Sequence, residues 1–255
     1  MSELERLDDT GHRREALGLI VKAGLLTASP MLWSAASAQG PGTAGYSSAL
    51  LKGYTSNQVK MSAGEFGGRP CITVELADEV QRRMLAGGAG NAPSFAIREG
   101  AFTDGVIEVD VAGELTGRGV ADSRAFVGVA FHLSSDAQTY EAVYLRMTNG
   151  TLNDPPPPPP RNVRAVQYVA HPDFHFDVSR SRSPGRYEKA APVALGRWHR
   201  LRLDIKGRRA QVQVDGARVL IVEDLKYAGR TGRIGLWVDD GTRGHFTNLS
   251  VTPAG

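Results

Sequence analysis

Short runs of alternating apolar and polar residues follow one another along most of the chain after residue 70. Alternation with period two sends successive side chains to opposite faces of a strand, so each run predicts a half-buried β-strand. Glycine, proline, asparagine and aspartate gather between the runs, as turns require. The expected strands are 71–76, 94–97, 106–111, 126–133, 140–147, 164–170, 198–207, 210–216, 218–223, 232–240 and 245–251. Only residues 76–88 carry the pattern of a short helix.

Many short strands with almost no helix predict an all-β fold in which two sheets bury their inner faces against each other, a jelly-roll sandwich. Residues 199–206 illustrate the pattern, with His, Leu, Leu and Ile at odd positions and Arg, Arg, Asp and Lys at even positions. The following "KGRR" predicts a tight turn and a hairpin with residues 210–216.

Six consecutive prolines, Pro155–Pro160, interrupt the strand pattern. Such a run favours an extended polyproline II conformation and cannot join a strand ladder. Strand patterns resume directly afterwards, which indicates a stiff surface loop inside the domain rather than a linker between domains.

The first 38 residues have the features of an export signal. Arg13-Arg14 precede a weakly apolar run, and Ala36-Ser37-Ala38 matches the small-x-small pattern of a signal-peptidase site. We therefore expect a twin-arginine signal peptide cleaved after Ala38, with a periplasmic or extracellular mature protein. A cytosolic amphipathic helix is the alternative. The Gly/Ser/Ala-rich residues 39–56 are expected to be a flexible tether before a single jelly-roll domain at 57–255.

Charge and cysteine content narrow the class of partner. The 255-residue chain has a formal net charge of +3, and its arginines are scattered rather than set in a stripe, which argues against nucleic-acid binding. A mildly basic surface favours an anionic ligand over a cationic one. No apolar run reaches the ~20 residues needed for a membrane span. The single cysteine, Cys71, permits no internal disulfide and is interpreted as a buried small side chain, with a nucleophilic thiol as the alternative.

Motifs for cofactors and metals are missing from the sequence. There is no phosphate-binding loop, dinucleotide fingerprint or Gly-x-Ser-x-Gly elbow, so no cofactor is expected. His171, Asp173 and His175 lie close together, but their spacing matches no zinc or calcium signature, so no metal site is expected.

The stretch "VIEVDVAGE" is similar to the catalytic strand of laminarinase- and lichenase-type β-glucanases, with Glu108, Asp110 and Glu114 as its carboxylates. A retaining glycosidase needs two carboxyl groups ~5 Å apart. Glu114 lies six positions after Glu108, ~20 Å away in an extended strand. We therefore interpret Glu108 and Asp110 as a solvated sheet face.

The second half resembles a secreted bacterial family of concanavalin A-like jelly rolls, similar to laminin G-like and 3-keto-disaccharide hydrolase domains. The resemblance lies in "FVGVAF", "YEAVYLRMTNG", "VQYVAHPDF" and "PGRYE", and continues through "GRWHRLRLDIKG", "VQVDG", "GRIGLWV" and "HFTNLSV". It implies a two-sheet sandwich. It does not by itself imply one chemistry, because such folds carry lectins, glycosidases, lyases and adhesion modules.

A ligand site is expected on one concave sheet face, where alternation places rings and polar groups beside small residues. The anchors would be His132, Tyr144, Arg146 and Trp237, with His132 sharing a face with Gly128 and Ala130. The alternative for Tyr144 and Trp237 is a place in the core. Loops would complete the substrate-binding set with Asn149, Arg161, Asn162, Gln167, Tyr168, Asp173 and Tyr187.

Three functions remain open. The first is recognition of a carbohydrate or glycoside, with an anionic one favoured by the net positive charge. The second, implied by the resemblance, is cleavage at a glycosidic bond, with Glu141, His171 or Glu188 as acid or base and Arg146 holding the developing negative charge. The third is a structural adhesion module. Nothing in the sequence pattern indicates an oligomeric state.

The export signal gives a direct prediction. Replacing both Arg13 and Arg14 by lysine should retain the precursor in the cytoplasm of a bacterial host, because the twin-arginine pathway reads the arginine pair. Fractionation and mass spectrometry would check this, with the unmodified chain yielding a mature protein that starts at Gln39. Export of the doubly substituted chain at the normal level would contradict the assignment.

Overall fold

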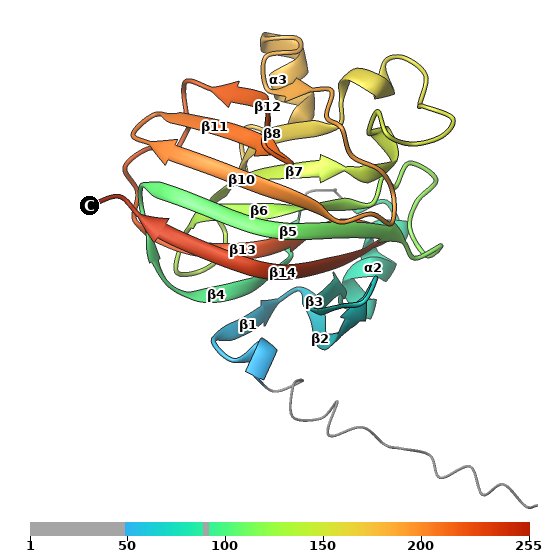
Figure 1. Ribbon diagram of the computed structural model, residues 1–255, viewed down its shortest axis with the longest axis horizontal. Helices are drawn as coiled ribbons and strands as arrows, with labels where there is room; N and C mark the ends of the chain where they lie inside the picture. The colour runs from blue at the N-terminus through green and yellow to red at the C-terminus, as the bar shows by residue number, and fades with distance from the viewer. Residues whose placement is uncertain (1–48, 89–91) are drawn as a thin grey trace, which may run out of the picture. The chain divides into compact units, whose positions relative to one another are not determined.

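Residues 49–88 and 92–255 are described by the computed structural model, and they form two seven-stranded antiparallel sheets stacked face to face (Figure 1). Sheet A contains, in spatial order, β1 (Tyr54–Asn57), β4 (Phe95–Phe102), β13 (Gly232–Val238), β6 (Phe126–Leu133), β7 (Tyr140–Arg146), β8 (Val166–His171) and β9 (Glu188–Lys189). Sheet B contains β12 (Ala217–Val222), β11 (Arg209–Val214), β10 (His199–Lys206), β5 (Gly105–Leu115), β14 (Thr242–Pro253), β3 (Arg69–Leu76) and β2 (Val59–Phe66). Two helices, α2 (Asp78–Leu85) and α3 (Phe176–Arg182), and two 3-10 turns, η1 (Met147–Asn149) and η2 (Arg161–Val163), lie between strands.

The predicted jelly-roll sandwich is confirmed, and each of the eleven expected strands is present. Sequence alternation missed β1, β2 and β9, which are mostly polar or only two residues long. It also missed α3. β1 falls within the segment expected to be a tether, and it pairs with β4 at the edge of sheet A. The proposed signal peptide and most of the tether lie outside the described residues.

The main core lies between the sheets. Val127 and Val129 of β6 belong to one buried apolar cluster with Val109 and Val111 of β5. In β10 the odd-numbered residues are buried and the even-numbered residues are exposed or half-buried, as the alternation predicts. The hexaproline run forms a loop between η1 and η2 and contributes no strand.

The outer face of sheet A carries a second apolar cluster, centred on Phe95, Tyr140, Tyr144 and Trp237. The Tyr140 hydroxyl and the Trp237 indole nitrogen both donate to the backbone oxygen of Ala92, at 3.2 and 3.4 Å. A segment crossing this face therefore satisfies the polar atoms of the rings, which otherwise pack against one another.

A β-bulge in β6 changes the position of His132. Arg233 pairs with Leu133 and Gly235 pairs with Ala130, so β6 contains one residue more than β13 over this interval. His132 has a φ of 50°, and its ring meets Glu141, while Leu133 joins the outer-face cluster. The expectation that His132 shares a face with Gly128 and Ala130 is wrong, because the bulge interrupts the alternation.

Glu141 is the centre of a buried polar network. Its carboxylate lies 2.6 Å from Nδ1 of His132, accepts from the Lys226 backbone nitrogen at 2.7 Å, and accepts from the Tyr168 hydroxyl. The His132 and Glu141 side chains are both fully buried. The network ties β6, β7 and β8 to the segment after β12, because each buried polar group needs a partner.

The carboxylates of β5 are engaged on the outer face of sheet B. Asp110 lies opposite Arg200 and accepts from its Nε at 2.8 Å, and Glu108 lies opposite Arg202 with a 3.1 Å contact. Glu114 contacts His245 instead, at 2.9 Å. Glu108 and Asp110 therefore form cross-strand ion pairs. Glu108 is half-buried and Asp110 is buried, so the expected solvated face does not extend to Asp110.

Cys71 is fully buried beside Thr73 and His245, and burial raises the pKa of its thiol. A raised pKa disfavours the thiolate, which agrees with a structural cysteine. Within 49–88 and 92–255, no helix has the length and apolar character needed to cross a bilayer.

The Glu141 network yields a stability prediction. Glu141→Gln should reduce the free energy of unfolding by about 3 kcal/mol, because an amide cannot accept all the hydrogen bonds that the buried carboxylate accepts and leaves buried donors unpaired. Urea denaturation would measure the loss. The matched control is Glu223→Gln, which removes an exposed carboxylate paired with Arg209 and should cost less than about 1 kcal/mol. Equal effects of the two substitutions would contradict this account.

Candidate functional site

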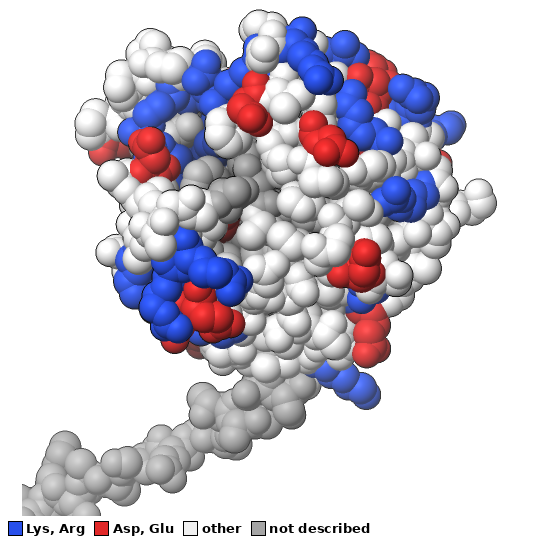
Figure 2. Space-filling view, turned by 180° about the vertical axis from the view of Figure 1, so that it is seen from behind, with Lys and Arg blue, Asp and Glu red and all other residues white. Residues whose placement is uncertain are grey.

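A cleft of about 430 Å³ crosses the ends of four neighbouring strands on the outer face of sheet A. Asp239 follows β13, Phe126 begins β6, Arg146 ends β7 and Arg164 precedes β8. Phe126 and Arg146 are direct cross-strand partners, so antiparallel pairing brings these positions to one edge. Figure 2 shows this side of the molecule, with lysine and arginine side chains gathered around a hollow.

Arg146 is held firmly at the end of β7. Its Nη2 donates to the Tyr144 hydroxyl and to Oε1 of Gln167, both at 3.1 Å, and its Nη1 donates to the Arg164 backbone oxygen at 3.3 Å. Burial lowers the pKa of the Arg146 guanidinium from its usual value. The alternation-based prediction that Tyr144 and Arg146 share a face is confirmed.

Glu188 of β9 binds three arginines. Arg180 donates from Nε at 2.9 Å and from Nη2 at 2.7 Å, Arg164 Nε lies 3.1 Å away, and Arg146 Nη1 lies 3.7 Å away. One buried carboxylate thus faces three guanidinium groups, which leaves a positive excess at this end of the cleft.

Arg161 is held by neutral groups. Its Nε donates to Oδ1 of Asn149 at 2.9 Å, and its Nη2 donates to Oγ1 of Thr148 at 3.1 Å. Burial, followed by the charge of Arg124, lowers the pKa of Arg161. Among the described residues Arg161 makes no ion pair within 4 Å, so its charge is available to a ligand.

Helix α3 supplies an aromatic rim. Phe176 and Arg180 are four positions apart and therefore share a helix face, with the guanidinium 4.9 Å from the ring centroid. Phe176 is 37% exposed, unlike the aromatic residues of the sheet below. It lines the cleft with part of its ring exposed.

Aspartates that follow β13 line the other end of the cleft. Asp240 accepts from Nε2 of Gln81 at 2.6 Å, from the Val120 backbone nitrogen at 2.9 Å, and from the Ser123 hydroxyl. These bonds fix the β5–β6 connection against α2. Asp239 and Asp240 line the cleft with Val120 and Met84, whereas Asp122 pairs with Arg124 and its charge acts on Arg161.

Tyr144 and Trp237, at the bottom of the cleft, are more tightly packed than the sequence indicated. Trp237 is fully buried and Tyr144 is 1% exposed, with ring centroids 4.6 Å apart. A Cβ at Gly128 would lie 2.6 Å from Cβ of Tyr144, so the room expected beside this small residue is filled. Tyr144 and Trp237 therefore support the cleft from below, and the rings expected to stack on a ligand are part of an outer-face core.

The structure brings together only part of the expected site. Tyr144, Arg146, Asn149 and Arg161 line the cleft. Trp237, Gln167 and Glu188 contact these residues from beneath or beside them. The remaining residues lie elsewhere: His132, Glu141 and Tyr168 in the buried network, Tyr187 against Asp224, and His171, Asp173 and Asn162 outside the cleft lining.

The physical reasons for these differences are local. Gln167 and Tyr168 are adjacent on β8 and point to opposite faces of sheet A, where Gln167 bonds Arg146 and Tyr168 bonds Glu141. The sequence reading missed Arg124, Arg164, Phe176 and Arg180. The spacing of four between Phe176 and Arg180 was the available signal, since it matches one helix face.

His171 and His175 form a pair near the start of α3, with Nδ1 of His171 3.0 Å from Nε2 of His175. The His171 ring also stacks on Tyr140, with centroids 5.0 Å apart. Burial, with a smaller contribution from His175, lowers the pKa of His171 to about 4. Across the described ranges no group of three or more His, Cys, Asp or Glu residues is arranged to hold a metal ion.

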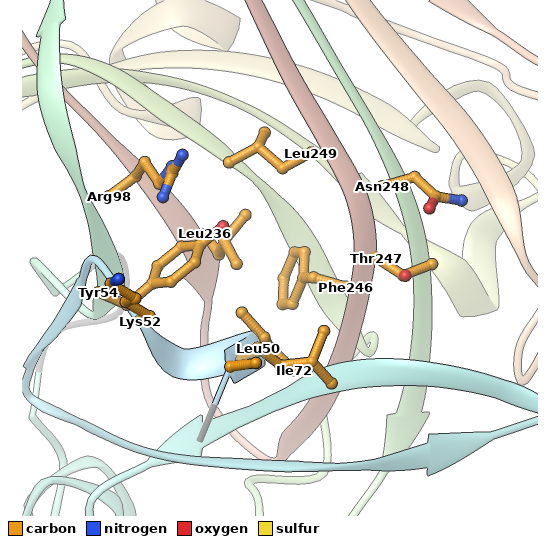
Figure 3. Close-up of a pocket in the computed structure, with 11 residues that line it drawn as sticks. Leu50, Lys52, Tyr54, Ile72, Arg98, Leu236, Phe246, Thr247, Asn248 and Leu249 are labelled. Carbon is orange, nitrogen blue, oxygen red and sulfur yellow. The ribbon is translucent and has the colours of Figure 1, made fainter. Parts of the chain in front are cut away.

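A smaller hollow of about 270 Å³ lies between the sheets near β1 and β14 (Figure 3). Leu50, Ile72, Leu236, Phe246 and Leu249 line it. Lys52, Tyr54, Arg98, Thr247 and Asn248 also line it. It is smaller than the cleft and holds two cationic side chains against the five arginines of the cleft, which is therefore the stronger candidate for a polar ligand.

Solved structures with the same fold include a carbohydrate-binding module from Bacillus subtilis, at 14% identity and a TM-score of 0.50, covering 77% of this chain and 93% of that one. A galectin-like protein of Bacillus subtilis has 11% identity, a TM-score of 0.43 and coverages of 78% and 97%. A galectin of Caenorhabditis elegans has 13% identity, a TM-score of 0.34 and coverages of 58% and 84%. No protein-family model and no curated protein matches the sequence. The likeness to the first structure establishes the concanavalin A-like jelly-roll fold, in agreement with the resemblance inferred from the sequence.

The histidine pair yields a pH prediction. Because the folded pKa of His171, about 4, lies below its ordinary value, the unfolded chain binds this proton more readily. This residue should therefore lower stability as pH falls from about 6.5 to about 4, with a slope of at most about 1.4 kcal/mol per pH unit. His171→Asn should flatten the pH dependence of the free energy of unfolding relative to the unmodified protein, and parallel curves would contradict the assignment.

Proposed function

We propose that this protein binds a carbohydrate in the cleft at the ends of β13, β6, β7 and β8. The observation that carries the proposal is the placement of the exposed Phe176 ring in the same cleft as Arg161, Arg164 and Asn149. A sugar ring has an apolar face that packs on an aromatic side chain and hydroxyl groups that pair with amide and guanidinium groups. The cleft supplies both kinds of contact.

The fold gives additional support. The jelly-roll neighbour with a TM-score of 0.50 is a carbohydrate-binding module. Because one fold can carry many functions, the side chains of the cleft carry the proposal, and the neighbour supports the class of ligand.

Binding is favoured over cleavage by the positions of the expected catalytic residues. Glu188 lies beside the cleft, whereas Glu141 lies on the inner face of sheet A, bonded to His132 and Tyr168. A glycosidase needs its two carboxyl groups within about 5–9.5 Å on either side of one bond. The sheet itself separates Glu141 from the cleft. On the strength of Arg13-Arg14, we propose that binding takes place outside the cytoplasm.

Phe176→Ala is the sharpest test of this function. It should weaken binding of a carbohydrate identified on a glycan array by about tenfold, because stacking contributes on the order of 1 kcal/mol or more. Isothermal titration calorimetry would measure the change. Phe176 is exposed, so the melting temperature should stay near that of the unmodified protein.

The matched control is Leu195→Ala, which truncates a side chain of 39% exposure outside the cleft. Its carbohydrate affinity should equal that of the unmodified protein. If no glycan binds, or if the two substitutions have the same effect, the cleft is not a carbohydrate site.

A further inference from the structure

The charges in the cleft are separated along its length. Asp239 and Asp240 lie at the β13 end, and Arg146, Arg161 and Arg164 lie at the β7–β8 end. Asp122 and Arg124, whose charges both act on Arg161, form an ion pair that adds no net charge. Three strand spacings separate β13 from β8 in sheet A, which is about 14 Å at ~4.8 Å per strand. A ligand that spans the cleft therefore meets carboxylates at one end and guanidinium groups at the other.

The basic end has unused donor capacity. Arg161 donates only to Asn149 and Thr148, through Nε and Nη2, so its Nη1 makes no hydrogen bond with the described residues. Arg164 meets Glu188 through Nε, and in the described part of the chain its two Nη groups make no hydrogen bond. Both side chains are partly exposed to the cleft.

Glu188 does not cancel the charge of this end. It neutralises one of the three arginines around it, and Arg161 adds a further charge held by neutral groups. The guanidinium planes are held in place by hydrogen bonds to the protein, so a planar anion can pair with them at little cost in side-chain entropy.

We propose that the carbohydrate is acidic, and that it binds in one direction with the carboxylate of a uronic acid residue on Arg161 and Arg164. This inference rests on the proposed carbohydrate-binding function. The aspartate end repels a second carboxylate, so a neutral sugar residue lies over Asp239 and Asp240. A planar carboxylate accepts two parallel hydrogen bonds from a guanidinium group, which fits this pair of arginines.

The experiment uses fragments of polygalacturonate, alginate and glucuronan, each compared with its carboxyl-reduced neutral counterpart on the mature protein. The acidic form should bind at least tenfold more tightly than the neutral form, because a charged hydrogen bond is replaced by a neutral one. Its affinity should also fall as salt concentration rises, while that of the neutral form should change little.

Substitutions locate the carboxylate. Arg161→Gln and Arg164→Gln should each reduce affinity for the acidic fragment about tenfold more than affinity for the neutral fragment, because only the acidic fragment loses a charged hydrogen bond. The charge-matched control is Arg209→Gln, which removes an exposed arginine of β11 outside the cleft. Because Arg161 also holds Thr148 and Asn149, the Arg164 variant keeps the test valid if the Arg161 variant unfolds.

The outcomes separate this inference from the proposed function. Equal binding of acidic and neutral fragments would leave carbohydrate binding intact and overturn the acidic specificity. Binding of sulfated but not carboxylated fragments would also overturn it. Failure of all fragments and of every neutral glycan would remove both proposals.

Discussion

Sheet A must be covered on both of its faces, and the rest of the structure follows from that requirement. All seven residues of β7 are buried, as are seven of the eight in β6. Sheet B covers the inner face. On the outer face, the side chains of Phe95, Tyr140, Tyr144 and Trp237 form a second buried cluster. The cleft opens at the strand termini, where Arg146 and Arg164 stand in place of the apolar side chains of the sheet interior.

The sequence predicted the sheets well because alternation of apolar and polar residues directly reflects which face of a strand is buried. Residues 199–206 and the shared face of Tyr144 and Arg146 follow that rule. His132 does not follow it, because one extra residue in β6 sends the side chains after it to the opposite face of sheet A. Phe176 and Arg180 belong to a helix of seven residues, too short for its periodicity to stand out in an arginine- and serine-rich segment.

The basic end of the cleft is linked to the fold through Glu188. This one carboxylate contacts arginines from β7, from the segment before β8 and from α3. A buried charge with several partners holds those partners in one arrangement, since any displacement leaves it less well solvated. The arginines are therefore positioned before a ligand arrives, and ligand binding does not have to order them.

Two connections between strands form the basic end of the cleft. One joins β7 to β8, and the other joins β8 to β9 at the edge of sheet A. The first connection carries the hexaproline run and Arg161, and the second carries α3. Neither supplies a strand to the sandwich core. Under the proposed function, the ligand contacts Arg161, Arg164 and Phe176 lie in these two connections, whereas Arg146 lies on β7. Grafting both connections, together with an arginine at the position of Arg146, onto another jelly roll with the same strand order is a route to transferring ligand preference without redesigning its sheets.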